Sequence, residues 1–221
     1  MARGRHPVRL NIDPPDKDMA DKYLQFWSGQ KLHFESHRFP GLTSSELFGN
    51  NRPLEIDFGC GTGVLACTRA RRFPNVNFLG IDLSQKPLYW AVRDAANLAL
   101  NNIKFIRGNF NEMLPLLQPN TVAAAYYLLP NLPENYFNER ANLRRRNLLQ
   151  AIIGSMIPGG RFFFATDSTV YFECIKNILT CDLHFETLSL ENAEAGMDTL
   201  YWKLWEEKGR TVQCLVIEKT T

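Results

Sequence analysis

The sequence predicts an α/β protein that is built on a mostly parallel sheet. Short apolar segments alternate with segments of helical periodicity from residue 54 onward, which is typical of parallel strands joined by right-handed crossovers. Two of the apolar segments end in an acid, and a glycine-rich turn follows the first of them. The chain of 221 residues is long enough for one such domain and a further terminal segment. We therefore expect residues 1–50 to form an N-terminal arm and cap, and residues 51–221 to form the domain.

Composition and charge favour a soluble cytoplasmic protein. Hydrophobic residues make up 45% of the chain and charged residues 22%, which is ordinary for a globular protein. No apolar run reaches the roughly 20 residues of a membrane helix, and the N-terminus has no signal-peptide core. The 5 cysteines form neither a C-x-x-C pair nor a zinc spacing, so we expect reduced thiols. The net charge of +2 permits a nucleic-acid partner without requiring one.

The N-terminal residues 1–10 are basic and contain no acid. Their basic side chains are Arg3, Arg5, His6 and Arg9. Two interpretations are open at this point. The segment is either a disordered terminus or a basic arm that contacts phosphate groups.

Aromatic side chains are frequent in the next part of the chain. Met19–Trp27 has helical spacing, and the chain from there to Phe39 is irregular, so we expect it to cover one side of a ligand cleft. His33 and His37 lie four residues apart, but no further acid–histidine set accompanies them. We therefore expect no metal site and interpret both histidines as solvent-facing or packing residues.

The stretch 54–63 combines a short apolar strand, an acid and a glycine-rich turn, and Val64–Arg72 continues with helical spacing. The glycines of the turn are Gly59, Gly61 and Gly63. They allow positive φ angles and a close approach of a ligand to the backbone, while the helix directs free N–H groups at the same place. The spacing G-x-G-x-G differs from the G-x-G-x-x-G of dinucleotide sites. It favours a nucleoside with a charged amino-acid tail, and Asp57 provides an acceptor for that ligand.

Two further strands are predicted to end at the same edge of the sheet. Asn77–Asp82 ends in the acid that a Rossmann-like fold uses to bind ribose hydroxyls. Ile103–Arg107 is followed by Asn109, which can bind an adenine edge, and by Phe110, which can flank the ring. Together these strand ends predict one nucleoside site. The alternative is that they are unrelated polar residues at strand ends.

The remaining elements continue the alternation of helices and strands. Ser84–Leu100 is predicted to be a helix, with Pro87 in its first turn. The side chains expected to face inward are Leu88, Val92, Ala95, Leu98 and Ala99. Thr121–Leu129 is wholly apolar, as expected for a strand at the centre of a sheet.

The C-terminal third contains a helix, a strand and a final hairpin. The helical pattern through Leu148, Leu149, Ile152, Ile153 and Met156 is expected to stop at Pro158-Gly159-Gly160. The strand Arg161–Thr166 then ends at Asp167, which could hold a substrate amine or cap the next helix. Asp198–Glu206 and Thr211–Glu218 flank Gly209 and predict the hairpin.

The strand ends at Asp57, Asp82 and Asn109 resemble the S-adenosylmethionine (SAM) site of class I methyltransferases. The wider order of motifs is similar to the tRNA (guanine-N7)-methyltransferase family over nearly the whole chain. These motifs are Asp-x-Gly-x-Gly-x-Gly, Gly-Ile-Asp, a proline-bracketed loop, an Arg-rich helix, Pro-Gly-Gly, Ala165-Thr166-Asp167 with Tyr171, and the closing Thr199-Leu200-Tyr201-Trp202.

The resemblance implies a Rossmann-like class I fold, with a seven-stranded, mostly parallel sheet and a C-terminal antiparallel hairpin. It also implies SAM as the cofactor. The cofactor-binding residues would be Asp57, Gly59, Gly61, Gly63, Asp82, Asn109 and Phe110.

The resemblance further implies which residues face the substrate. Asn131 and Asp167 would lie in the catalytic region. The substrate-binding residues would be Tyr136, Arg144, Thr166, Asp167, Thr199 and Trp202, and the phosphate contacts would come from Arg3, Arg5, Arg9 and Arg144–Arg146. Two positions depart from the family pattern, because Asn131 replaces an Asp and Trp202 replaces a Glu that binds the guanine edge.

These departures leave several functions open. The first hypothesis is SAM-dependent methylation of a purine-like ring nitrogen, with N7 of a tRNA guanine as the first choice. The second is N-methylation of a small azaheteroaromatic metabolite at a rebuilt site, and the third is a non-catalytic RNA-binding relative. The glycine spacing disfavours a nicotinamide-dependent oxidoreductase. We expect tRNA or a small heteroaromatic compound as the partner, and neither a membrane nor a metal; the oligomeric state stays open.

Overall fold

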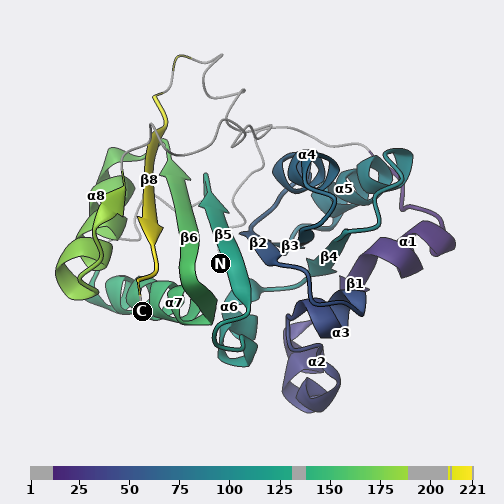
Figure 1. Cartoon of the computed structure of the whole chain (residues 1–221), viewed down its shortest axis with the longest axis horizontal. Helices are drawn as coiled ribbons and strands as arrows, with labels where there is room; N and C mark the ends of the chain where they lie inside the picture. Colours follow the sequence, from purple (N-terminus) through teal and green to yellow (C-terminus); the bar gives the residue numbers. More distant parts are fainter. Residues whose placement is uncertain (1–11, 131–137, 189–208, 210, 221) are drawn as a thin grey trace.

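A single mixed sheet organises the computed structural model, which describes residues 12–130, 138–188, 209 and 211–220. The sheet has 8 strands in the order β1-β4-β3-β2-β5-β6-β8-β7 (Figure 1). The strands are β1 (Leu24–Phe26), β2 (Leu54–Phe58), β3 (Asn77–Asp82), β4 (Ile103–Arg107), β5 (Val122–Leu128), β6 (Met156–Thr166), β7 (Thr187–Leu188) and β8 (Gln213–Glu218). The strands β1 to β6 pair in parallel, and β8 is antiparallel to both of its neighbours. The predicted fold class is confirmed. The described sheet has 8 strands rather than the predicted seven, because it includes the unpredicted strands β1 and β7.

Helices cover both faces of this sheet. They are α1 (Lys17–Tyr23), α2 (Gly29–Phe34), α3 (Ser44–Phe48), α4 (Val64–Arg72), α5 (Gln85–Asn97), α6 (Phe110–Met113), α7 (Glu139–Ser155) and α8 (Thr169–Asn177). Successive strand residues alternate between the faces. Phe78 therefore packs in the apolar cluster with α4 and α5, and Leu79 packs in the cluster that includes α7 and α8. Figure 1 shows α4 and α5 beside β2 to β4, and α7 and α8 beside β5, β6 and β8.

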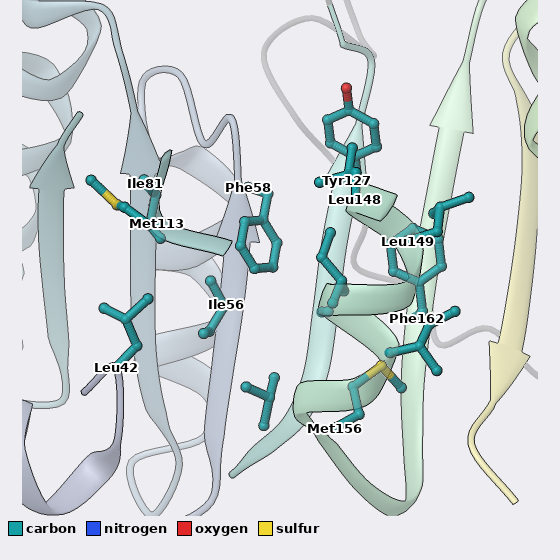
Figure 2. Close-up of a cluster of buried hydrophobic side chains, with 14 of the residues drawn as sticks. Leu42, Ile56, Phe58, Ile81, Met113, Tyr127, Leu148, Leu149, Met156 and Phe162 are labelled. Carbon is teal, nitrogen blue, oxygen red and sulfur yellow. The ribbon is translucent and has the colours of Figure 1, made fainter. Parts of the chain in front are cut away.

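The larger core cluster lies between α7 and the middle of the sheet. Figure 2 shows Leu148 and Leu149 of α7 lying over β5 and β6, near Tyr127 and Phe162. Ile56 of β2, like Phe162, is fully buried. Burial on this scale stabilises each large side chain by about 1.5–3 kcal/mol and holds the strand ends in fixed positions.

A buried polar group connects β2, β5 and α4 on the opposite face. Arg69 Nε donates to Glu55 Oε2 at 2.8 Å, and Arg69 Nη2 donates to Glu55 Oε1 at 3.2 Å. The Tyr126 hydroxyl donates to Glu55 Oε2 at 2.8 Å. Burial, followed by the Glu55 carboxylate, raises the pKa of Tyr126, which keeps its hydroxyl protonated as the donor. The last turn of α4 is thereby held against the two central strands.

The N-terminal segment differs from the predicted helix over Met19–Trp27. The helix α1 ends at Tyr23, because the next residues pair with β4 as the parallel strand β1. The Tyr23 hydroxyl donates to Leu100 O at 2.8 Å, and Trp27 N donates to Arg107 O at 2.9 Å. Trp27 is buried and packs edge-on against Phe39, with ring centroids 5.0 Å apart. Tertiary pairing therefore overrides the helical spacing.

Two helix ends also differ from expectation. The helix α5 ends at Asn97, so Leu98 is exposed and Ala99 takes a left-handed φ of 50°, which corrects the inward assignment of both. The helix α7 ends at Ser155, and Met156 begins β6 by pairing with Val122. The strand β6 is consequently longer than the predicted Arg161–Thr166 and includes the Pro-Gly-Gly sequence.

The predicted C-terminal hairpin is only partly within the described residues. Gln213–Glu218 forms β8, which pairs with β6 along its length. On its other side, β8 pairs with Thr187–Leu188, a strand that the sequence analysis missed. The predicted partner strand 198–206 lies outside the described residues.

Candidate cofactor and substrate site

The described candidate site residues occur at or just after the ends of β2, β3, β4 and β6, with Arg144 on α7. Because β2 to β6 are parallel, their carboxyl ends meet at one edge of the sheet. Ligands in open α/β sheets bind at this edge. The order of the strands therefore brings Asp57, Asp82, Asn109 and Asp167 to the same side of the molecule.

The turn between β2 and α4 forms the centre of the site. Gly59 N and Cys60 N both donate to Ile81 O, at 2.8 and 3.1 Å, which fixes the turn to the end of β3. Gly59 has a φ of +85°, and a Cβ atom built on it would meet nothing within 4 Å. The backbone at Gly59 therefore borders open space, as a close ligand contact requires.

Gly63 has a different role from Gly59. Its φ is +73°, but a Cβ atom at this position would lie 2.6 Å from the Ala91 Cβ atom of α5. The glycine at this position thus lets the start of α4 pack against α5. This contact holds the N-terminus of α4 against the middle of α5.

Asp82 links the two loops that follow β2 and β3. Its Oδ2 atom accepts from Gly61 N at 2.8 Å, and its Oδ1 atom accepts from Ser84 N at 2.6 Å. Each carboxylate oxygen has a further lone pair for a ligand hydroxyl. Leu83 follows directly and is 67% exposed, which gives the site an apolar surface beside the acid. Sequence analysis missed Leu83, although its position after the acid was a usable signal.

Asp57 is buried and has an unusual ionisation. Burial, followed by the nearby Asp82 carboxylate, raises the pKa of Asp57 from its usual 3.8 to about 7. The same two causes raise the pKa of the buried Cys60 thiol. A cationic group bound at this place would favour the charged form of Asp57. The site is therefore suited to a ligand that carries an ammonium group.

The end of β4 gives a more local arrangement. Asn109 is the N-cap of α6, where its Oδ1 atom accepts from Asn111 N at 3.2 Å and its Nδ2 atom donates to Glu112 at 3.1 Å. The Phe110 ring packs edge-on against Phe58 and Tyr127, with centroid distances of 5.8 and 5.9 Å. Phe110 thus joins the ends of β2, β4 and β5 through an aromatic contact.

The end of β6 carries Thr166 and Asp167. Thr166 is buried, and its Oγ1 atom accepts from Ser168 N at 3.2 Å. Ser168 is the N-cap of α8 and accepts from Tyr171 N, so the alternative that Asp167 caps this helix is wrong. Asp167 is half-buried at the edge that also carries Asp57 and Asp82.

The arginine run on α7 divides between surface and core. Arg144 and Arg146 are exposed, whereas Arg145 is 5% exposed. Arg145 Nη1 donates to Asn142 Oδ1 at 2.6 Å, and its guanidinium carbon lies 5.2 Å from the Tyr171 ring centroid. The expected phosphate contact of Arg145 is therefore corrected, because the helical period places this residue on the buried face with Leu148 and Leu149.

Several predicted positions lie outside the described residues. These are Arg3, Arg5, Arg9, Asn131, Tyr136, Thr199 and Trp202. Within the described ranges, no group of three His, Cys, Asp or Glu side chains could hold a metal ion, and His33 and His37 are exposed. No helix in the described part of the chain is long and apolar enough to cross a membrane.

Comparison with known proteins gives a consistent result. The family described as "Putative methyltransferase" matches residues 51–215. The tRNA (guanine-N(7)-)-methyltransferase of Rubrobacter xylanophilus is 38% identical over 208 residues, which cover 92% of this chain and 93% of that protein. The enzyme of the same name from Chloroherpeton thalassium is 32% identical and covers 94% of each chain.

The structural comparison supports the fold. The crystal structure of the aminoglycoside resistance methyltransferase NpmB1 aligns with a TM-score of 0.55 and 20% sequence identity. The alignment covers 81% of this chain and 94% of that chain. At this identity the likeness concerns the arrangement of strands and helices alone.

Proposed function

Because this chain belongs to the tRNA (guanine-N7)-methyltransferase family, we propose that it transfers a methyl group from SAM to N7 of a guanine in tRNA. The observation that carries the proposal is the edge formed by the β2–α4 turn and Asp82. There, an open glycine, a buried acid and a backbone-anchored carboxylate occur together. The near full-length relatives supply the choice of tRNA over other methyl acceptors.

The residues at this edge fit the parts of SAM. Asp82 would accept from the ribose hydroxyls, and Leu83 would contact the apolar face of the adenine. Asp57 would bind the ammonium group, which restores its charge, and the open backbone at Gly59 would accept the close approach of the cofactor. Asn109 would bind the adenine edge after its side chain gives up its hydrogen bond to Glu112. When bound, SAM supplies an activated methyl group.

The chemistry asks little of the protein beyond position. Guanine N7 carries a lone pair and no proton, so no strong general base is needed and Asn131 can replace an acid there. The protein must hold the nitrogen in line with the methyl group and exclude water. Thr166 and Asp167, at the end of β6, would do this, and Trp202 and Tyr136 would contact the base.

The tRNA backbone would be bound by basic groups outside the cofactor site. Arg144 is exposed on α7, and the N-terminal arginines provide a further source of positive charge. All cysteines of the chain are free, as expected in the cytoplasm, where we place the activity.

The decisive experiment combines labelled SAM with unmodified tRNA transcripts and detects 7-methylguanosine by mass spectrometry. The wild-type chain is expected to form this product. The variant Asp82→Ala should lose about 1–3 kcal/mol of SAM binding by calorimetry, because charge-assisted hydrogen bonds to the ribose are removed.

Other outcomes would identify the alternatives. Methylation of a small-molecule extract but not of tRNA would indicate a rebuilt substrate site around Trp202. Binding of SAM and tRNA without turnover would indicate a non-catalytic RNA-binding relative. Unchanged SAM affinity in Asp82→Ala would refute the cofactor assignment.

A further inference from the structure

A second concave site lies between the N-terminal segment and α5. It has a volume of about 230 Å³ and is separate from the glycine turn. Its lining includes Pro15, Leu24, Phe26, Gln85, Tyr89 and Arg107. The segment 12–27 reaches this place because Arg93 of α5 donates to Asp13 O at 3.1 Å and β1 pairs with β4.

The register of the sheet places this pocket beside the cofactor edge. Arg107 is the last residue of β4 and pairs with Phe26 on one side and with Asp82 on the other. Residues paired in this way project from the same face of the sheet. The side chain of Arg107 therefore lies on the face of Asp82, one strand further from the glycine turn.

Arg107 is held in place without a hydrogen bond at its Nε atom. This atom is buried and has no hydrogen-bond partner among the described residues. The guanidinium carbon lies 4.6 Å from the centroid of the Phe26 ring, and Phe26 is still 51% exposed. Stacking on an aromatic ring orients the planar fork of donors that arginine offers to phosphate. The exposed part of the ring is available to a nucleobase, which stacks on aromatic side chains in RNA sites.

The positive charge of the described pocket lining comes from Arg107. Among the described residues, no acid lines the pocket, and the α1 residue in its wall is Ala20 rather than Asp18 or Asp21. The α5 helix begins at Gln85 beside the pocket, and its first turn contains Lys86 and no acid. A helix N-terminus carries a partial positive charge, which an acid commonly offsets. Here Asp82 offsets it, because its Oδ1 atom accepts from the N-cap Ser84 N at 2.6 Å.

We propose that this pocket binds one nucleotide of the tRNA, with its phosphate at Arg107 and its base against Phe26. The proposal rests on the proposed function and adds a subsite for the same substrate. In this arrangement Arg107 contacts the RNA backbone, and Asp82 lies between Arg107 and the target guanine. The N-terminal basic residues 1–10 are joined to the chain that forms one wall of this pocket.

The test compares Arg107→Gln with Arg72→Gln in the full-length protein. Arg72 is a matched control, because its guanidinium also lies over an aromatic ring, that of Phe73 at 5.2 Å, but at the end of α4. Binding of unmodified tRNA is measured by fluorescence anisotropy over a range of salt concentrations, and SAM binding by calorimetry. Arg107→Gln should weaken tRNA binding about tenfold. The slope of log Kd against log salt should fall by about 1. Arg72→Gln and the SAM affinity of both variants should match wild type.

A second variant guards against a folding defect. Phe26→Leu keeps an apolar side chain but removes the stacking surface. It should weaken tRNA binding, and the slope of log Kd against log salt should change by less than it does in Arg107→Gln. Thermal unfolding of each variant is recorded beside the binding data.

The outcomes separate this inference from the function on which it rests. Wild-type protein that neither binds nor methylates tRNA would overturn both. Wild-type methylation of tRNA together with wild-type affinity in Arg107→Gln would overturn the subsite alone. A loss of SAM affinity in Arg107→Gln, with tRNA affinity retained, would assign the pocket to the cofactor and overturn the proposal as well.

Discussion

At the scale of single residues, the site depends on two carboxyl groups that have opposite surroundings. Asp82 accepts hydrogen bonds from two backbone N–H groups, those of Gly61 and Ser84. Asp57 is buried next to it, and its pKa is raised to about 7. The two acids therefore differ in hydrogen bonding, although they lie at the ends of neighbouring strands.

The raised pKa of Asp57 predicts a pH dependence of cofactor binding. The carboxyl group is mostly protonated below about pH 7, so an ammonium-bearing ligand must displace a proton there. SAM affinity should rise about tenfold per pH unit up to pH 7 and level off above it. Calorimetry in buffers of different ionisation enthalpy measures both the affinity and the proton release. In Asp57→Asn the affinity should be weaker and nearly independent of pH; a wild-type profile in that variant would contradict the assignment.

The same group affects the stability of the cofactor-free protein with a definite sign. The folded carboxyl keeps its proton up to about pH 7, whereas the unfolded one releases it near its usual 3.8. The folded state thus binds more protons in this window, so its contribution to stability falls as pH rises from about 4 to 7. This contribution is absent from Asp57→Asn.

At the scale of elements, two of the three glycines of the turn have separable functions. Gly63 lets α4 pack on α5, and Gly59 borders open space. Both have positive φ angles, so an alanine strains the backbone at either position.

Gly63→Ala should therefore lower the free energy of unfolding by more than Gly59→Ala does. The added Cβ atom would lie 2.6 Å from Ala91 Cβ, and such overpacking costs about 1–3 kcal/mol beyond the backbone strain. Gly59→Ala serves as the control, because it carries the strain without the clash and should mainly reduce SAM binding. Urea unfolding measures the difference; equal losses in the two variants would show that the α4–α5 contact adapts.

Helix and strand ends were predictable where local chemistry marks them. The bounds of α4, β3 and β4 agree with the predictions, because an acid, a glycine or a helix-terminal arginine run ends each apolar segment. β1 and β7 were missed because such short strands have no period of their own and exist only through pairing with β4 and β8. The same limit applies to Arg145, whose burial follows from the packing of α7 and not from its charge.

At the scale of the whole molecule, the parallel order of β2 to β6 gathers the predicted acids on one edge. The strand ends and the glycine spacing were sufficient to predict which side chains meet at this edge, and their binding of the cofactor stays a prediction. The Arg107 pocket was not predictable, because it depends on the N-terminal segment returning to the edge of the sheet, a contact between residues 81 positions apart.

At this scale, the basic N-terminal residues 1–10 are expected to contribute to tRNA binding. Removing residues 1–10 should weaken tRNA binding and flatten its salt dependence, because the arginines there no longer displace counterions. The described fold begins beyond this segment, so SAM binding should be retained. Filter binding at several salt concentrations checks the result. A truncated protein with an unchanged salt slope would mean that the phosphate contacts come from elsewhere.

The position of β8 between β6 and β7 has a consequence for synthesis on the ribosome. Both neighbours precede β8 in the chain, and β7 pairs with the sheet through β8. As domains begin to fold while the chain emerges, β6 must leave one edge unpaired until β8 is translated. An open edge strand is a template for association with other chains. Nascent chains stalled before residue 213 should therefore recruit chaperones more strongly than chains that have released β8 from the exit tunnel.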